Sequence, residues 1–187
     1  IRLRQIGEKD MIILERDCDV GGVWRDNRYP GCACDVESHL YSMSFAPNPN
    51  WSTVFAKQPE IYDYLKHCAE KFNLLQLIRF QHNVQRMDWD ATNGVWIIQT
   101  NKGEFRARMV IGAFGALSDP NIPHLKGIEE FKGKAFHSAN WPSRLDLKDK
   151  RIAVVGPGAS AIQFIPEIQP QVKQLYVFQR TPPWIIP

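Results

Sequence analysis

The sequence lacks several features that would point directly to a function. Its four cysteines include no Cys-x-x-Cys pair, and Cys32-Ala33-Cys34 has no second set of ligands. We therefore expect reduced thiols in a cytoplasmic protein without a bound metal. No apolar run approaches the ~20 residues that span a bilayer, so no membrane-spanning helix is expected. The basic residues form no long run and the net charge is only +3, which argues against nucleic acid as a partner.

Both ends of the sequence also lack ordinary signals. The sequence begins with Ile1 rather than Met, and it ends just after an apolar strand-like run. We therefore expect an internal piece of a longer protein. The composition is 44% hydrophobic and 23% charged, as in globular proteins. The slight basic excess suits a small polyanionic ligand such as a dinucleotide.

Hydrophobic periodicity predicts a mixed α/β fold. A buried parallel strand is expected at 11–15, further strands at 152–155 and 174–179, and helices at 1–5, 59–72 and 161–168. The turn pairs Asn93-Gly94 and Lys102-Gly103 predict an inserted antiparallel meander, with strands at 78–90, 95–100 and 105–114. We expect two Rossmann-like dinucleotide-binding units, the first incomplete, joined by a connection over Gly115–Pro142.

A glycine-rich turn follows the strand predicted at 152–155. The sequence Gly-Pro-Gly-Ala-Ser-Ala occupies 156–161 and precedes a helical pattern, which is the context of a dinucleotide fingerprint. The first glycine allows a tight turn, the second lets the backbone approach a pyrophosphate, and the final alanine stands where helix and strand pack closely. The N–H groups of the helix N-terminus face the phosphates. The expected binding residues are Gly156, Gly158, Ala159, Ser160 and Ala161.

Two polar residues follow the last predicted strand. Arg180 and Thr181 stand where an NAD site carries an acid that binds the ribose 2′-hydroxyl. A guanidinium and a hydroxyl match a 2′-phosphate through charge-assisted bonds, so the pattern favours NADP over NAD. An ordinary surface arginine is the alternative. Glu15 closes an earlier apolar strand, as the ribose-binding acid of another dinucleotide site would, but no glycine turn precedes it in the sequence.

The segment before the glycine turn reads FKGKAFHSANWP over 131–142. It places Phe131, Gly133, His137, Trp141 and the following proline at the fixed positions of a linker motif. With this motif, the chain resembles the type I Baeyer–Villiger monooxygenases, flavoproteins that use FAD and NADPH. The resemblance extends over nearly all of the chain. It implies an FAD-binding domain lacking its first strand and glycine loop, a linker, and the first βαβ unit of an NADP-binding domain, at 1–116, 117–150 and 151–187.

The front of the chain also matches the flavin-binding stretch of that family, at 20–24, 27–31, 34–38 and Tyr41. The resemblance implies that Glu15 binds the adenosine ribose of FAD and that the backbone of Val84 contacts adenine, although Val84 also fits a core strand position. The residues expected to line the flavin are Gly22, Val23, Trp24, Asn27, Asp35 and Tyr41.

Two residues are candidates for a catalytic role by the same resemblance. Asp35 would also lie near the nicotinamide. His137 would lie in the hinge between the nucleotide domains and couple the position of NADPH to domain movement, although a purely structural histidine is the alternative. Many members carry an arginine before the Cys-Asp pair, whereas this chain has Ala33 there. No NADPH contact and no narrow substrate class can therefore be carried over from that position.

The resemblance implies an oxidoreductase in which NADPH reduces FAD and one oxygen atom of O2 is inserted beside the carbonyl of a ketone. The expected partners are thus a ketone and O2. The arginine that supports oxygenation would lie beyond this chain, and so would the first glycine turn, which would hold the FAD pyrophosphate. A chain of this length alone is therefore expected to bind FAD weakly or not at all, and to be inactive. Two alternatives are a flavin monooxygenase that oxidises nitrogen or sulfur atoms, and a truncated remnant without activity.

Overall fold

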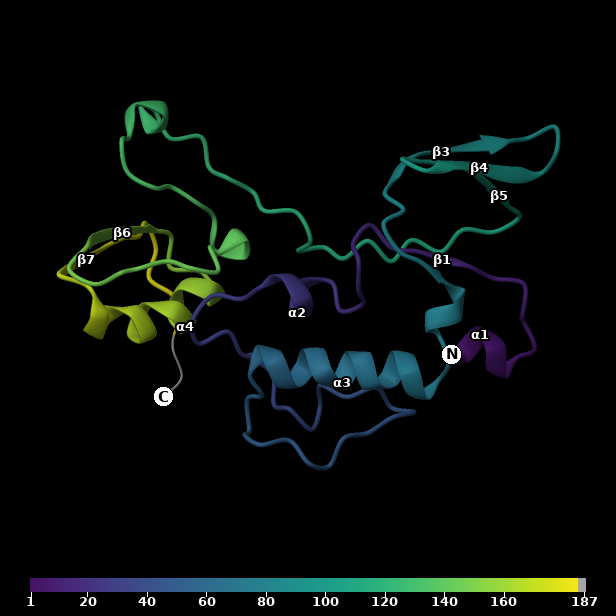
Figure 1. Cartoon of the computed structure of the whole chain (residues 1–187), viewed down its shortest axis with the longest axis horizontal. Coiled ribbons are helices and arrows are strands. Elements are labelled where there is room, and N and C mark those ends of the chain that lie inside the picture. The colour runs from purple at the N-terminus through teal and green to yellow at the C-terminus, as the bar shows by residue number, and fades with distance from the viewer. Residues whose placement is uncertain (185–187) are drawn as a thin grey trace. The chain divides into compact units, whose positions relative to one another are not determined.

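The computed structural model of the chain describes residues 1–184, so the last three residues of the predicted 151–187 segment lie outside the described part. The chain forms two compact units, each built from two separate stretches. The first unit contains Ile1–Gly22 and Asp63–Ala116, and the second contains Val23–Tyr62 and the chain from Leu117 onward. Figure 1 shows their helices and strands along the chain.

In the first unit, two short strands pair in parallel. The strand β1 (Ile13–Leu14) pairs with β2 (Ile78–Arg79), in the register Ile13 with Ile78. The helix predicted at 1–5 is observed as α1 (Arg2–Gln5). The strand predicted at 11–15 is shorter than expected, and Ile13 is 41% exposed rather than buried. Among the described residues only β2 pairs with β1, so one edge of β1 has no neighbouring strand to bury it.

The antiparallel meander of the first unit is confirmed. Its strands are β3 (Val84–Asp90), β4 (Val95–Thr100) and β5 (Gly103–Ala107), in the order β3-β4-β5. Both predicted turns contain a glycine with positive φ, +63° at Gly94 and +136° at Gly103. Trp89 and Trp96 stand opposite each other on β3 and β4, with their ring centroids 5.5 Å apart and tilted by 58°.

Two strand predictions around the meander are wrong in their extent. The single strand predicted at 78–90 is split into β2 and β3, because the chain turns between them, with Gln81 at φ +59°. The strand predicted at 105–114 ends at Ala107. Met109, Ile111 and Phe114 are exposed, and no strand within residues 1–184 pairs with this run. An apolar run becomes a buried strand only where neighbouring strands or helices cover it.

The predicted helix at 59–72 is observed as α3 (Gln58–Lys71). Pro59 lies in its first turn, where the missing N–H costs no helical hydrogen bond. The expected apolar face is buried at Ile61 and Cys68, and half-buried at Tyr64 and Leu65. No helix in residues 1–184 has the length and apolar character needed to cross a bilayer.

The second unit contains a strand–helix–strand motif. The strands β6 (Arg151–Val155) and β7 (Gln174–Phe178) pair in parallel, and α4 (Ala159–Ile168) connects them through the short 3-10 helix η4 (Gln169–Gln171). β1 and β6 belong to separate sheets, as the prediction of two units requires. The earlier part of this unit contributes α2 (Val23–Asp26), and the later part contributes the 3-10 helices η2 (Ile128–Glu130) and η3 (Ser138–Asn140).

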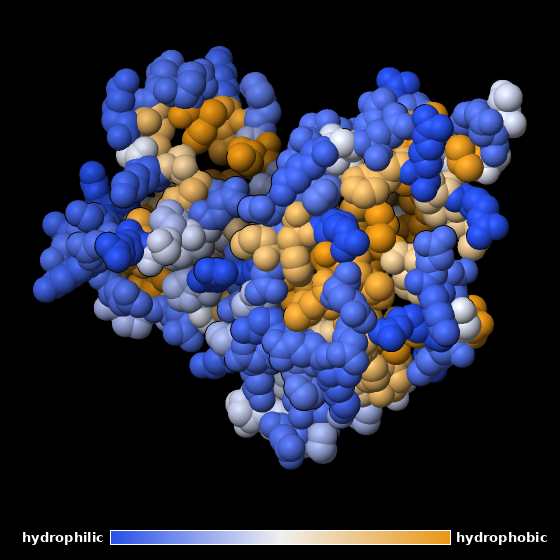
Figure 2. All heavy atoms as spheres, turned by 45° about the vertical axis from the view of Figure 1, so that its right-hand side comes forward, coloured by the Kyte–Doolittle hydropathy of each residue, from blue (hydrophilic) through white to orange (hydrophobic). Residues whose placement is uncertain are grey.

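The core of the second unit joins residues that are distant in sequence. Its buried members are Tyr29, Cys32, Leu147, Val154, Ala161, Phe164 and Ile168. Tyr29 and Cys32 come from the loop after α2, whereas Phe164 and Ile168 come from α4. Apolar side chains also reach the surface, where Figure 2 shows orange atoms between blue polar ones. Among the large apolar or aromatic residues of the strand pair, Val155, Tyr176 and Phe178 are exposed.

Candidate functional site

The glycine turn between β6 and α4 has the geometry of a backbone ligand-binding site. Gly156 has φ +96°, a conformation that side chains disfavour, and its N–H donates to the carbonyl of Phe178 at 2.9 Å. A Cβ added to Gly156 or Gly158 would meet no atom of the described chain within 4 Å. The space beside both glycines is therefore open to a ligand.

The helix that follows the turn begins without a side-chain cap. Gly158 is the N-cap of the ten-residue α4, and it makes no side-chain cap hydrogen bond. The first N–H groups of a helix have no partner within the helix, and its dipole favours an anion there. Ala161 of α4 is buried and belongs to the same core cluster as Val154 of β6. These residues fit the pyrophosphate of a dinucleotide.

Arg180 and Thr181 lie at the same sheet edge as the glycine turn. In the parallel register, Val155 at the end of β6 pairs with Phe178 at the end of β7. Gly156 follows the first of these strands, and Arg180 follows the second two residues later. Both Arg180 and Thr181 are exposed. The glycine turn, which could bind a phosphate, and the cation Arg180 thus both follow the carboxyl ends of these strands. Open α/β sheets bind their ligands at this edge.

The segment that leads to Asp35 is fixed by hydrogen bonds on two sides. On one side, the N–H of Cys34 donates to the carbonyl of Ala56 at 2.8 Å, and the N–H of Gln58 donates to the carbonyl of Cys32 at 2.8 Å. On the other side, the side chain of Gln163 on α4 bonds the peptide of Ala33. Asp35 itself is exposed. Its carboxylate is thus presented at the surface by a tightly held backbone.

Two of the predicted flavin-lining residues contact each other. The indole Nε1 of Trp24 donates to the hydroxyl of Tyr41 at 3.0 Å, and the two rings meet edge to face with centroids 5.5 Å apart. The Gln58 side chain also donates to the carbonyl of Trp24. Directly after α2, the N–H of Asn27 donates to the carbonyl of Val23 at 2.9 Å. The structure therefore brings Val23, Trp24, Asn27 and Tyr41 into one local cluster.

The remaining predicted FAD contacts lie in the first unit. Gly22 has φ +51° and is the last residue of Ile1–Gly22, the first of the two stretches that make up this unit. The N–H of Glu15 donates to the carbonyl of Arg79 at 3.1 Å, and its carbonyl accepts from the N–H of His82 at 2.8 Å. Its carboxylate accepts from the N–H of Asp17 at 2.9 Å. Val84 follows His82 by two residues and is the first residue of β3, where it pairs with Thr100 of β4.

His137 caps a short helix in this structure. Its Nδ1 accepts from the N–H of Ala139 at 3.2 Å, and its carbonyl accepts from the N–H of Asn140 at 2.9 Å. The ring is half-buried. Trp141 packs against Phe136 and Phe164, with centroid distances of 5.3 and 5.2 Å. This end of the linker motif is therefore anchored to the core of the second unit, whereas a hinge role for His137 stays a prediction.

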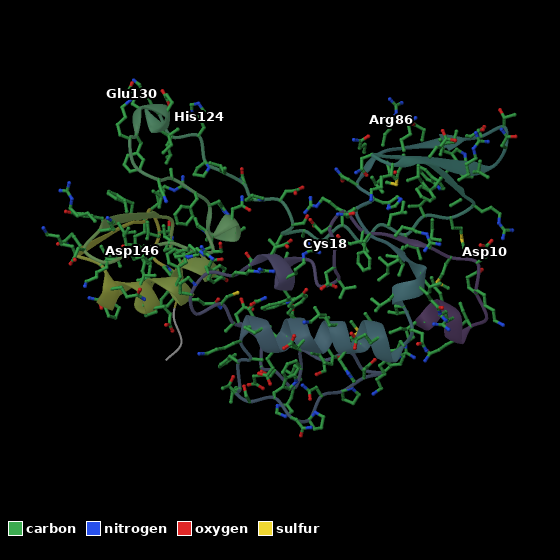
Figure 3. All side chains as sticks on the ribbon, viewed as in Figure 1. Asp10, Cys18, Arg86, His124, Glu130 and Asp146 are labelled. Carbon is green, nitrogen blue, oxygen red and sulfur yellow. The ribbon has the colours of Figure 1, made fainter. Side chains whose placement is uncertain are left out.

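The buried cysteines and tyrosine of this unit are held neutral. Burial raises the pKa of the Cys32 and Cys34 thiols above the ordinary value, so both stay protonated at neutral pH and neither is an activated nucleophile. Burial also raises the pKa of Tyr29 to about 12. Cys18, labelled in Figure 3, is exposed in the loop that follows β1 in sequence. All four cysteines are free thiols. Within residues 1–184, no cluster of His, Cys, Asp and Glu side chains could hold a metal.

Sequence reasoning missed two residues of this region, Tyr29 and Gln163. The hydroxyl of Tyr29 donates to Oε1 of Gln163 at 3.0 Å, across 134 positions of sequence. One signal was available, because Gln163 is a polar residue between Ala161 and Phe164, which the helical pattern places in the core. A polar side chain in such a position needs a hydrogen-bond partner, and Tyr29 and Ala33 provide it.

A mixed α/β fold, an antiparallel three-stranded sheet and an open glycine turn at a helix N-terminus form the arrangement that is expected of nucleotide-binding proteins. The family model of flavin-binding monooxygenase-like proteins matches residues 7–187, and the chain belongs to this family. A Baeyer–Villiger monooxygenase of Streptomyces coelicolor is 52% identical over 187 residues, and one of Pseudomonas aeruginosa is 52% identical over 188. The resemblance to Baeyer–Villiger monooxygenases is thereby confirmed.

Solved structures agree with this assignment. A steroid monooxygenase bound to NADP matches all of the chain with a TM-score of 0.88 and 43% identity. The OTEMO complex with FAD and NADP matches 98% of the chain with a TM-score of 0.90 and 38% identity. The chain covers 37% and 36% of those two proteins, and it spans 36% of the length of both bacterial relatives.

Proposed function

We propose that the protein containing this chain is an FAD- and NADPH-dependent monooxygenase that inserts one oxygen atom of O2 beside the carbonyl of a ketone. The observation that carries the proposal is the glycine turn at the carboxyl edge of β6 and β7, with Arg180 on the same edge. It is supported by the 52% identity to two Baeyer–Villiger monooxygenases over the whole chain. The linker sequence at 131–142 favours ketone oxidation over nitrogen or sulfur oxidation.

We propose that the chain contributes to two Rossmann-like domains. Residues 1–116 belong to the FAD-binding domain, 117–150 form the linker, and 151–187 begin the NADP-binding domain. The hydrogen bonds between Ala33 and Gln163 then join a segment of the FAD domain to the first helix of the NADP domain. In this arrangement α4 contacts the NADP pyrophosphate through its N-terminus, and it holds the FAD-domain segment at Ala33 through Gln163.

Each part of the candidate site has a binding task in this proposal. FAD supplies the redox chemistry when bound, accepting a hydride from NADPH and activating O2. The N–H groups that follow Gly156 and Gly158 bind the NADP pyrophosphate, with Ala159, Ser160 and Ala161 in the same turn. Arg180 and Thr181 bind the 2′-phosphate. Glu15 binds the FAD ribose, and the backbone of Val84 contacts its adenine.

The remaining residues surround the reacting rings. Gly22, Val23, Trp24, Asn27 and Tyr41 line the flavin, where the paired Trp24 and Tyr41 rings form a rigid wall. Asp35 approaches the nicotinamide from the well-held segment after Ala33. His137 acts from the linker by coupling the position of NADPH to domain movement. Trp141 anchors that linker on Phe164.

The function is tested by turnover of the full-length protein. Purified protein with FAD should oxidise NADPH when supplied with cyclic or aryl ketones, and the ester or lactone product should carry one atom of label from ¹⁸O₂. Thioethers and tertiary amines serve as competing substrates. Product only from the thioether or amine would favour a heteroatom oxidase, and no flavin binding at all would indicate a remnant without activity.

The cofactor preference is tested by Arg180→Ala. Loss of a charge-assisted phosphate contact should cost about 1.5–3 kcal/mol, which raises the KM for NADPH by roughly 10-fold to 150-fold. The KM for NADH should change little, because NADH has no 2′-phosphate. Lys173→Ala, an exposed cation just before β7 at the opposite sheet edge, is the matched control. Equal losses with both cofactors would contradict the role of Arg180.

A further inference from the structure

The side-chain amide of Gln163 both donates a hydrogen bond to the backbone of Ala33 and accepts one from it. Its Nε2 donates to the carbonyl of Ala33 at 2.9 Å, and the N–H of Ala33 donates to its Oε1 at 3.2 Å. The hydroxyl of Tyr29 donates to the same Oε1 at 3.0 Å. One side-chain amide therefore pairs with both the backbone N–H and the backbone carbonyl of Ala33, a residue 130 positions away in sequence.

The same segment also fits the helix sterically. Gly31 has φ +74°, and a Cβ built on it would lie 2.7 Å from the carbonyl oxygen of Gln163 and 2.8 Å from Cγ of Glu167. Real Cβ contacts are essentially never that short, and the first of these neighbours is backbone that cannot move aside. The loop therefore lies directly on α4, and the hydrogen bonds of Gln163 fix its register there.

This contact places two functional groups on one helix. Gln163 is four residues after Ala159, the first residue of α4, which is about one helical turn. The N-terminus of this helix is the proposed pyrophosphate site, and Asp35 follows Ala33 by two residues. Cys32 and Cys34 also form backbone hydrogen bonds with Gln58 and Ala56. The backbone at Ala33 is therefore hydrogen-bonded on two sides. The hydrogen bonds of Gln163 therefore fix the backbone before Asp35 relative to α4, the helix that would hold NADP.

We propose that Gln163 is a positioning residue, which holds the segment carrying Asp35 at a fixed place relative to bound NADPH. The inference rests on the proposed function, since it assigns Asp35 to the nicotinamide side. The hydrogen bonds of the Gln163 side chain go to Tyr29 and Ala33, so its proposed role is to act through the segment of Asp35. Hydride transfer depends steeply on geometry, so loosening this segment lowers the rate of transfer more than it lowers the affinity for the cofactor.

The test is anaerobic reduction of the full-length holoenzyme by NADPH in a stopped-flow instrument. Gln163→Leu preserves the approximate volume and removes all three hydrogen bonds. Its limiting rate of flavin reduction should fall on the order of 10-fold to 100-fold, since small misplacements have effects of this size. The Kd for NADPH should change by no more than about threefold, because ground-state contacts are kept. FAD content and reduction by dithionite should match the wild type.

Two further variants separate positioning from general damage. Gln169→Leu makes the same chemical change at an exposed glutamine just after α4, and it should behave as wild type. Gln163→Glu keeps the acceptor for Tyr29 and for the N–H of Ala33 but loses the donor, so its limiting rate should fall between those of wild type and Gln163→Leu. Where Gln163→Leu does not fold, Tyr29→Phe removes one of the three bonds and should give a smaller fall in the same rate.

The outcomes distinguish this inference from the function on which it rests. A wild-type flavin that NADPH does not reduce overturns the proposed function and the inference with it. A wild-type flavin that is reduced, with the same limiting rate in Gln163→Leu, overturns the inference alone. A loss confined to thermal stability does so as well, because a merely structural contact would change the melting temperature and leave the rate unchanged.

Discussion

The β3–β4–β5 meander and the β6–α4–β7 motif reach their structures by different kinds of contact. In the meander, each strand pairs with its neighbour in sequence through a short turn, at Gly94 or Gly103. In the βαβ motif, the core is completed by Tyr29 and Cys32, which come from more than a hundred positions earlier. The meander is thus specified locally, whereas the motif with the candidate site depends on long-range packing.

This difference has a physical consequence for where the chain tolerates change. In the meander, changing one side chain removes its contacts with the neighbouring strand only. Few of these contacts are buried, since Trp89, for example, is half exposed. A change in the docked core removes contacts for several segments together. Comparing matched substitutions in the two regions by amide hydrogen exchange tests this contrast, since exchange reports the opening free energy of each region separately.

The largest effect is expected from Phe164→Ala. Phe164 is 7% exposed and packs against Tyr29 and Trp141. Removing a buried aromatic ring costs about 3–5 kcal/mol, from lost burial and the cavity left behind. Amides of β6 and β7 should exchange correspondingly faster. Trp89→Ala in the meander should cost only about 1 kcal/mol, because that ring is half exposed. Equal losses in both regions would contradict the contrast.

A smaller effect is expected from Gly31→Ala, for which Gly94→Ala is the matched control. Both glycines have positive φ, +74° and +63°, and an alanine in this region costs about 1–2 kcal/mol at either place. Only Gly31 also brings the new Cβ into the helix backbone, so its total should reach about 2–4 kcal/mol. Urea unfolding of both variants measures the excess. Equal values would show that the loop can move away from α4.

The smallest effect is a pH dependence that distinguishes the docked region. The pKa of Tyr29 is raised by burial from 10.0 to about 12, so the unfolded chain loses this proton at a lower pH than the folded chain. The resulting stability is fully present below pH 10 and is lost as the pH rises from 10 towards 12. Its size is on the order of 1–2 kcal/mol. Tyr29→Phe should remove this alkaline loss in urea unfolding at pH 9 and pH 11.

The exposed Tyr176 on β7 provides the control for that measurement. Tyr176→Phe makes the same chemical change at an exposed position, and its stability should be compared with the wild type at both pH values. If Tyr29→Phe and wild type weaken equally between these two pH values, burial of Tyr29 is not the cause.

The same contrast explains what the sequence could predict. The meander and α3 were predictable because Asn93-Gly94, Lys102-Gly103 and a helical apolar face are local signals. The glycine turn was predictable for the same reason. The end of β5 at Ala107 was not, since the apolar run beyond it reads as a strand and only the absence of a neighbouring strand within residues 1–184 ends it.

The docking of the loop on α4 was outside the reach of sequence reasoning. No local pattern links Gln163 to Ala33, because the pairing depends on how 130 intervening positions fold. The roles of Asp35 and His137 came from family resemblance, whereas the position of each came from the structure. Asp35 follows a backbone held on two sides, and His137 caps η3.

The tryptophan pair of the meander has an optical consequence. The indole rings of Trp89 and Trp96 lie 5.5 Å apart at a 58° tilt, close enough for their ultraviolet transitions to couple and far enough from parallel for the coupling to be chiral. Such a pair gives a two-signed band in circular dichroism that vanishes when the strands separate. The meander therefore carries its own spectroscopic label, by which its opening can be followed without any attached dye while the rest of the protein stays folded.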